Sequence, residues 1–232
     1  MEIVEAVVAN VLLVHGAWSD GSLWQEVIAA LDDQGHQVRA VQLPLTSLID
    51  DIAWTRREIS EFDGPVTLVG HSYGGMVISG AAEHSEQVDA LVFVAAYAPG
   101  QDETVASLSD RGAKMPGGEA IRFAEDGWST IDSGMFAEVL AADVPAAKGR
   151  VLAATQKPTH GACFAQPAGP SAWRNLPCAY VLSLDDQILD PGLQRWFAER
   201  TNATLTELRS SHLSPVARPE KVAAAISKAL NT

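Results

Sequence analysis

Six short hydrophobic runs recur along the 232-residue chain, separated by longer segments with helical periodicity. Most of these runs are continuous rather than alternating, as in parallel strands that are covered on both faces. The runs lie at residues 11–14, 38–43, 66–70, 90–96, 179–184 and 204–208. The segments between them predict helices near residues 23–31, 49–62, 75–84, 192–200 and 219–230. This alternation predicts an α/β fold built on a doubly wound, mostly parallel sheet.

Residues 98–177 interrupt this alternation, because they are rich in glycine and proline and show no strong strand pattern. Helices are predicted there over residues 135–142 and 149–156. The alternative is a long irregular loop, but structureless loops of that length are rare in compact domains. We therefore expect one domain over residues 1–232, with residues 98–177 forming a small inserted helical cap.

Composition and charge narrow the range of partners. Hydrophobic residues make up 47% of the chain, and the formal net charge is −13. That charge repels nucleic acid and anionic lipid, so we expect no nucleic-acid or membrane partner. No hydrophobic run approaches the roughly 18 residues of a membrane span, and residues 1–5 lack the positive region of a signal peptide. A soluble cytoplasmic protein is the expectation; the oligomeric state stays open, a homodimer included.

The sharpest local pattern is Gly-His-Ser-Tyr-Gly at residues 70–74, directly after a predicted strand and directly before a predicted helix. In this GxSxG pattern, glycines permit a strained strand-to-helix turn that projects the serine hydroxyl above the sheet. A plain glycine-rich turn with a capping serine is the alternative. The context favours Ser72 as a nucleophile.

A serine hydroxyl is a weak nucleophile, so it needs a histidine as base and an acid that orients the histidine. In this architecture the order along the chain is serine, acid, histidine. Three of the six histidines precede or adjoin Ser72, and two others lie in a predicted helix and in the insertion. His212 follows the strand at 204–208 and precedes the last helix, where a base reaches the carboxyl edge of the sheet. We assign His212 as the base rather than as a solvated loop residue.

The acid is expected after the strand at 179–184, where Asp185, Asp186 and Asp190 compete. Asp190 precedes a proline, as a helix N-cap does. Asp185 and Asp186 would point in opposite directions if the strand continued, and the pattern alone does not choose between them. Asp102 remains an outside candidate at the same edge of the sheet.

Attack on a carbonyl produces an oxyanion, which needs two preorganised donors. One is expected to be the backbone N–H of Tyr73, and the other the N–H of Ala17 in the turn after the first strand. His15 and His71 are expected to support these turns rather than act directly. Two cysteines without metal-ligand spacing, Cys163 and Cys178, are expected to be small buried side chains. We predict no metal and no cofactor.

Several segments together resemble the α/β-hydrolase superfamily, in particular its small esterases related to plant methyl esterases and hydroxynitrile lyases. They lie at residues 15–18, 70–76, 93–100, 173–200 and 211–212. The resemblance implies that Asp186 is the acid, because it matches the catalytic second aspartate of such relatives. Hydroxynitrile lyases of this family carry a lysine after the catalytic histidine and a threonine in the first strand. This chain has Leu213 and Leu12 there, which favours ester hydrolysis.

The expected function is that of a serine carboxylesterase that hydrolyses small carboxylic esters with water through an acyl-enzyme. Alternatives on the same three residues are a C–C bond hydrolase, a cofactor-free haloperoxidase or a hydroxynitrile lyase, and a ligand-binding receptor is a more remote one. The small cap is expected to limit the substrate to small molecules. Four side chains of the insertion would either line the pocket or simply pack against the core: Phe123, Trp128, Met135 and Phe136.

Overall fold

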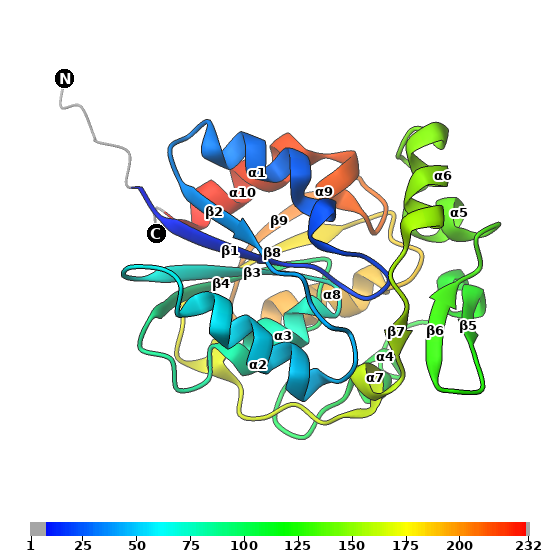
Figure 1. Ribbon diagram of the computed structural model, residues 1–232, viewed down its shortest axis with the longest axis horizontal. Coiled ribbons are helices and arrows are strands. Elements are labelled where there is room, and N and C mark those ends of the chain that lie inside the picture. Colours follow the sequence, from blue (N-terminus) through cyan, green and yellow to red (C-terminus); the bar gives the residue numbers. More distant parts are fainter. Residues whose placement is uncertain (1–7, 231–232) are drawn as a thin grey trace.

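The central sheet matches the predicted parallel architecture. The computed structural model describes residues 8–230, so residues 1–5, on which the signal-peptide argument depends, lie outside the described residues. Within residues 8–230 the main sheet has six strands in the order β2-β1-β3-β4-β8-β9, and all neighbours are parallel (Figure 1). The strands are β1 (Asn10–Val14), β2 (Gln37–Ala40), β3 (Val66–His71), β4 (Val88–Val94), β8 (Cys178–Ser183) and β9 (Thr204–Leu208).

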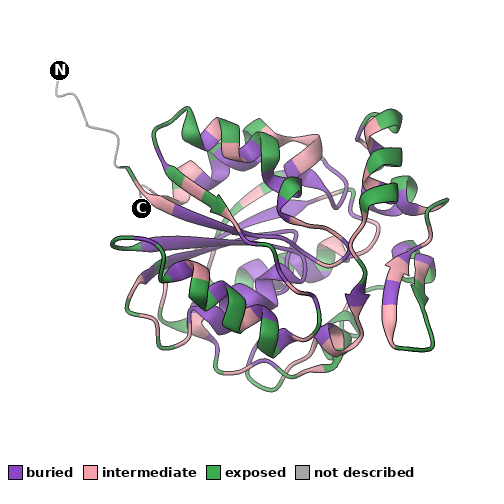
Figure 2. Ribbon diagram, viewed as in Figure 1, coloured by how far each residue is buried: buried purple, intermediate pink, exposed green. Residues whose placement is uncertain are grey.

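Helices cover both faces of this sheet (Figure 1). One face carries α1 (Gln25–Asp32), α9 (Ser214–Ala217) and α10 (Pro219–Leu230), and the other carries α2 (Leu48–Ile59), α3 (Gly74–Ala81) and α8 (Pro191–Arg200). Successive strand residues point to opposite faces, so Val11 and Leu13 belong to one core and Leu12 and Val14 to the other. The four inner strands, β1, β3, β4 and β8, are accordingly buried along most of their length, whereas the edge strands β2 and β9 are mostly half-buried or exposed (Figure 2). The doubly wound α/β fold is confirmed.

Two strands end earlier than their hydrophobic runs predict. In the run at 38–43 the strand ends at Ala40; the Val41 N–H still donates to Leu13 O, but the Leu43 N–H donates to Nε2 of His15 instead of to a strand. The run at 90–96 leaves the sheet after Val94, since Ala95 adopts a positive φ of 43°. Both strands end at the carboxyl edge of the sheet, where the chain continues into loops.

The chain between β4 and β8 forms the insertion. Its helices include α5 and α6, close to the two predicted there, and its strands form a small antiparallel sheet in the order β5-β6-β7. The sequence shows no strand pattern for this sheet, because segments of two to four residues are too short to show alternation. The elements of the insertion are α4 (Val105–Ser109), η2 (Pro116–Ala120), β5 (Ile121–Phe123), β6 (Trp128–Ile131), α5 (Phe136–Leu140), α6 (Ala146–Thr155), β7 (Thr159–His160), α7 (Ala162–Ala165) and η3 (Ala172–Arg174). Outside the insertion, a 3-10 turn, η1 (Gly21–Trp24), precedes α1.

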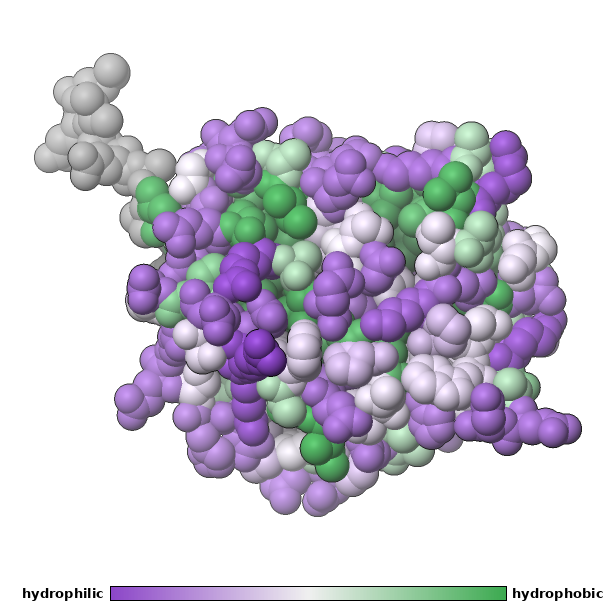
Figure 3. Space-filling view, viewed as in Figure 1, coloured by the Kyte–Doolittle hydropathy of each residue, from purple (hydrophilic) through white to green (hydrophobic). Residues whose placement is uncertain are grey.

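The insertion lies at the carboxyl ends of the central strands (Figure 1). It is joined to the turn after β1, because the Trp18 N–H donates to Thr159 Oγ1 and the Trp18 indole donates to Ser129 Oγ. Hydrophobic residues on the face drawn in Figure 3 form separate patches among hydrophilic ones. Among the described residues, no helix has both the length and the apolar character needed to cross a membrane.

Candidate active site

Ser72 occupies a strained turn between β3 and α3. Its φ of 53° is in the left-handed region, which costs of the order of 1–3 kcal/mol for a residue other than glycine. The turn is held by backbone bonds, because the Ser72 N–H donates to Val94 O and the Ser72 carbonyl accepts from the N–H groups of Gly75 and Tyr97. A Cβ at Gly74 would lie 2.6 Å from Val14 O, so only glycine allows α3 to start this close to β1. Sequence and geometry agree on this turn.

His212 and Asp186 lie together at the edge of the sheet, and both are almost fully buried. His212 Nδ1 is 2.6 Å from Asp186 Oδ2. The other contacts of Asp186 all come from donors, so its carboxylate accepts and Nδ1 carries the imidazole proton. Nε2 of His212 is then left with a free lone pair.

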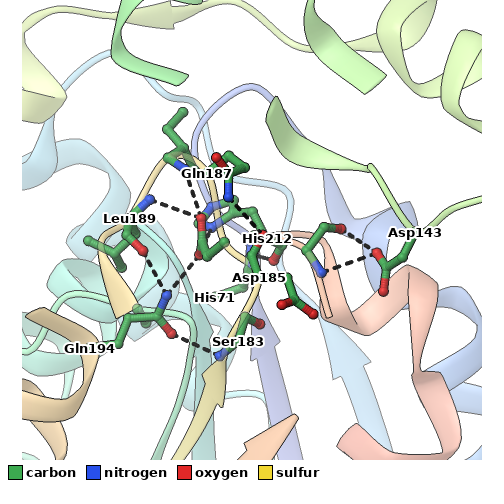
Figure 4. Close-up of polar contacts among 12 residues, drawn as sticks. His71, Asp143, Ser183, Asp185, Gln187, Leu189, Gln194 and His212 are labelled. Carbon is green, nitrogen blue, oxygen red and sulfur yellow. Dashed lines mark hydrogen bonds and ion pairs between the residues drawn. The ribbon is translucent and has the colours of Figure 1, made fainter. Parts of the chain in front are cut away.

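Asp186 is fixed by three further donors, two of which come from Leu189 and Gln194, labelled in Figure 4. Oδ1 accepts from the N–H groups of Ile188 and Leu189, both at 2.9 Å, and Oδ2 accepts from Gln194 Nε2 at 2.9 Å. Gln194 is itself fully buried, and its Oε1 accepts from the Ser183 N–H at 3.0 Å. The carboxylate therefore has little freedom to turn away from His212.

The other candidate acids have different surroundings. Asp185 is 3.8 Å from the exposed guanidinium of Arg209, and its side chain is half exposed. Asp102 is exposed. Asp190 accepts from the Gly192 N–H as the N-cap of α8, which confirms that reading, and from the Ala113 N–H of the insertion. Of these carboxylates, only Asp186 lies in contact with His212.

His71 holds the backbone of His212. Its Nε2 lies 3.0 Å from the His212 carbonyl, to which it donates, and the two rings are 4.7 Å apart. Burial and the nearby His212 lower the pKa of His71 well below its usual value, so it stays neutral. His15 accepts from the Leu43 N–H through Nε2 and donates from Nδ1 to Gly16 O, and burial lowers its pKa to about 4. His15 therefore contacts the turn that it was expected to support, whereas the His71 side chain bonds the backbone of His212 instead.

A carboxylate of the insertion anchors the loop before His212. Asp143, between α5 and α6, accepts from Ser210 Oγ at 3.0 Å and from the Ser211 N–H at 3.2 Å, and Ser211 Oγ donates to it as well. Arg218 forms an ion pair with the same carboxylate. Figure 4 shows the Asp143 contacts on the opposite side of His212 from Gln194.

The Tyr73 N–H belongs to the serine turn, and the turn that contains the Ala17 N–H packs against it. Gly16 packs so closely that a Cβ there would lie 2.7 Å from Ser72 Cβ, which brings the turn containing Ala17 against Ser72. Among residues 8–230, the structure gives neither the Ala17 nor the Tyr73 N–H a hydrogen-bond partner. Both are available to an incoming oxyanion.

A cavity of about 740 Å³ opens over these groups. Ser72, His212, Ala17 and Tyr73 all line it, together with mostly apolar side chains of the insertion. This volume falls within the roughly 300–1,000 Å³ typical of drug-sized ligands, so the cavity is larger than a small cap led us to expect. No group of three potential metal-ligating side chains gathers among the described residues.

The four aromatic and methionine candidates of the insertion divide between the two roles. Phe123 lines the cavity and is 59% exposed. Phe136 is buried in the core, and Met135 packs against the same core. Trp128 packs edge-on against His160, with ring centres 5.3 Å apart. Of the four, only Phe123 is placed to contact a ligand in the large cavity.

Gln194 and Asp143 are site residues that the sequence analysis missed. Gln194 shares a helix with buried Leu193 and Phe197, and a polar residue next to hydrophobic ones on a predicted helix was the available signal. Asp143 has no comparable signal, since its partners lie 67 and 68 residues further along the chain.

Two curated relatives cover part of this chain. Carbendazim hydrolyzing esterase of Nocardioides sp. (strain SG-4G) is 35% identical over 115 residues, which are 43% of this chain and 47% of that esterase. Methylesterase 1 of Arabidopsis thaliana is 32% identical over 122 residues, 45% of this chain and 46% of that protein. The chain thus matches about half the length of these relatives, and the resemblance to plant methyl esterases is confirmed.

Similarity in structure and in family sequence extends over nearly the whole chain. A crystal structure of a pyrethroid hydrolase from Sphingobium faniae JZ-2 has a TM-score of 0.85 at 21% identity, covering 97% of this chain and 98% of that one. At this identity the likeness shows the fold alone. The model of the alpha/beta hydrolase family matches residues 11–225, from β1 into α10. This protein therefore belongs to the α/β-hydrolase family.

Proposed function

We propose that this protein is a serine carboxylesterase in which Ser72, His212 and Asp186 act as a unit. Ser72 Oγ attacks the ester carbonyl while His212 Nε2 takes its proton and passes it to the alcohol leaving group. Asp186 keeps the imidazole in the tautomer that leaves Nε2 free and stabilises the imidazolium that forms. The observation that carries the proposal is the 2.6 Å contact between His212 Nδ1 and the fully bonded Asp186 carboxylate, beside a cavity that Ser72 and His212 both line.

The N–H groups of Ala17 and Tyr73 hold the oxyanion in both tetrahedral intermediates. After the alcohol leaves, His212 activates a water molecule that attacks the acyl-enzyme and releases the carboxylic acid. Every proton in this sequence moves between the substrate, water, Ser72 and His212. The steps therefore need only protein groups and water.

We propose residues 98–177 as the cap that selects the substrate. The cavity is mostly apolar, with Phe164 and Val105 among its lining residues. Apolar walls favour esters whose acyl or alcohol part is uncharged and hydrophobic. A volume of about 740 Å³ supports substrates of up to drug size rather than short esters alone. A panel of p-nitrophenyl esters with increasing acyl length measures this preference.

The alternative reactions on the same three residues differ in the bond that is cleaved. Cyanohydrin cleavage has little support, because Leu213 stands where the related lyases carry lysine, and Leu12 of β1 is fully buried in the core. Product analysis on an ester, a cyanohydrin and a β-diketone distinguishes esterase, lyase and C–C hydrolase chemistry. We expect turnover of the ester only.

Replacing Ser72 tests the proposal directly. Ser72→Ala should lower the turnover of p-nitrophenyl butyrate by on the order of a million-fold, as removal of the nucleophile does in a serine hydrolase. The matched control is Ser79→Ala in α3, a buried serine whose hydroxyl bonds only Gly75 O in its own helix. Comparable turnover by the Ser72 and Ser79 variants would overturn the assignment.

A further inference from the structure

Asp51 is a buried carboxylate that the proposed mechanism does not use. It lies in the first turn of α2, and its side chain is fully buried. Oδ1 accepts from the Leu45 N–H at 2.8 Å, and Oδ2 accepts from the Tyr73 hydroxyl at 2.7 Å. The Cys163 thiol, 3.7 Å away on α7, is a third donor. No Lys, Arg or His of residues 8–230 forms an ion pair with it.

A carboxylate in this place is costly for the fold. Taking a charge out of water costs several kcal/mol even after relaxation, and burial raises the pKa of Asp51 against the opposing effects of its hydrogen bonds and of the positive charge of Lys157. The N-terminus of α2 offsets part of that cost. An apolar residue in the same place would avoid the cost of a buried charge, but it would leave the buried Leu45 N–H and Tyr73 hydroxyl without their acceptor. We therefore infer the role of the carboxylate from its three donors: it holds the groups that donate to it in a fixed orientation.

Two of these donors belong to the surroundings of the oxyanion site. Tyr73 directly follows Ser72, and its own N–H is one of the two proposed oxyanion donors. Cys163 directly precedes Phe164, whose ring lies 6.2 Å from the Tyr73 ring and 5.4 Å from the Trp18 ring. Trp18 directly follows Ala17, which supplies the other donor. Contacts that begin at Asp51 therefore reach both oxyanion turns.

We propose that Asp51 is a positioning residue for the oxyanion site, which it orients through the Tyr73 hydroxyl and the Cys163 thiol. This inference rests on the proposed esterase function. The Tyr73 N–H sits in a turn that Ser72 enters at a φ of 53°, and a side chain anchored 22 residues away keeps that turn from relaxing. Oxyanion donors are effective only within about 2.7–3.1 Å of the developing charge, so small displacements reduce the rate.

Asp51→Asn tests the role with little change in volume. The amide oxygen can still accept from Leu45, but its NH2 group can only donate to the Tyr73 hydroxyl, so the charge-assisted bond from that hydroxyl to a carboxylate is lost. We expect kcat for p-nitrophenyl butyrate to fall about tenfold or more, with KM within about twofold, because the lost interaction acts in the transition state. Tyr73→Phe removes the same hydrogen bond from the other side and should act alike. The double variant should be no worse than the poorer single variant, since both break one contact.

Thr55→Val is the matched control for general damage to α2. Thr55 is also fully buried on α2, and its hydroxyl bonds only the Asp51 carbonyl. We expect this variant to keep kcat, at equal folded fraction by circular dichroism. If Asp51→Asn fails to fold, Tyr73→Phe carries the test, because it removes the hydrogen bond to Asp51 and leaves the carboxylate itself unchanged.

Inhibition by a trifluoromethyl ketone separates a positioning role of Asp51 from a merely structural one, because it measures how well the oxyanion is bound. Ser72 adds to its carbonyl, the proton passes to His212, and the resulting oxyanion needs the same two N–H groups. Its inhibition constant should rise in Asp51→Asn by the same factor as kcat/KM falls, while inhibition by the product acid stays unchanged. Unchanged kcat, or a rise in KM alone, would overturn the role of Asp51. Full activity of Ser72→Ala would instead refute the esterase proposal.

Discussion

His15 is a buried histidine that supports the first oxyanion turn only while it is neutral. The Leu43 N–H donates to its Nε2, so that nitrogen must keep its lone pair. Burial lowers its pKa from 6.5 to about 4. Since the folded-state pKa is the lower one, the unfolded chain binds more protons between these values. The stability that comes from neutral His15 is therefore complete above pH 6.5 and is lost as the pH falls toward 4.

His15→Gln should remove this part of the pH dependence, because an amide can still accept from Leu43 and donate to Gly16. At about 1.4 kcal/mol per pKa unit, we expect the parent protein to lose about 3 kcal/mol more stability than the variant between neutral pH and pH 4. Urea unfolding at a series of pH values gives both curves. Curves that stay parallel over this range would contradict the prediction.

At the scale of single residues, a role that depends on a local motif or on chain order can be predicted from the sequence. A role that depends on a contact between distant segments cannot. Ser72 stands in a local motif, and His212 follows from chain order. The choice of Asp186 over Asp185 needed a family resemblance, because adjacent positions at a strand end look alike without coordinates. Gln194 and Asp51 were not predicted, because each forms its hydrogen bond with a residue in a different element.

At the scale of elements, the main strands and helices could be predicted because each has a continuous run or a helical stripe that faces the core. The small sheet of the insertion could not. Its strands have two to four residues, and the Thr159 hydroxyl of β7 accepts from the Trp18 N–H, 141 residues away. Such a sheet is specified by contacts with the rest of the fold rather than by its own periodicity.

The insertion also bonds the loop that carries His212, which gives a prediction for a residue remote in sequence from the site. Asp143→Ala leaves the Ser211 N–H and two serine hydroxyls without their acceptor. Displacement of this loop should lower kcat about tenfold, because catalytic groups tolerate little misplacement. The free energy of unfolding should fall by about 1–3 kcal/mol. Initial rates and urea unfolding measure the two effects.

Glu207→Ala serves as the control for loss of one acidic residue. Glu207 forms a partly exposed ion pair with Arg195, on β9 and α8, and such pairs contribute about 0–1 kcal/mol. This variant should keep the kcat of the parent protein. If Asp143→Ala keeps it too, the insertion does not position His212.

At the scale of the whole molecule, chain length and cavity size lead to different substrate expectations. The insertion is short, which suggested small substrates, yet a cavity of about 740 Å³ lies beneath it. Residues of α4, η2 and β5 line this cavity together with Ser72 and His212 at the sheet edge. Cavity size depends on how elements are spaced, and composition does not report that spacing.

The net charge of −13 gives the last prediction. An anionic ester approaches a negatively charged molecule, and exposed Asp110 and Glu119 line the cavity itself. Salt screens this repulsion, with a Debye length that shrinks from about 30 Å at 0.01 M to about 3 Å at 1 M. We expect kcat/KM for mono-p-nitrophenyl succinate to rise several-fold over that range, while the value for uncharged p-nitrophenyl butyrate stays nearly constant. Equal salt dependence of the two esters would show that the charge does not influence substrate approach.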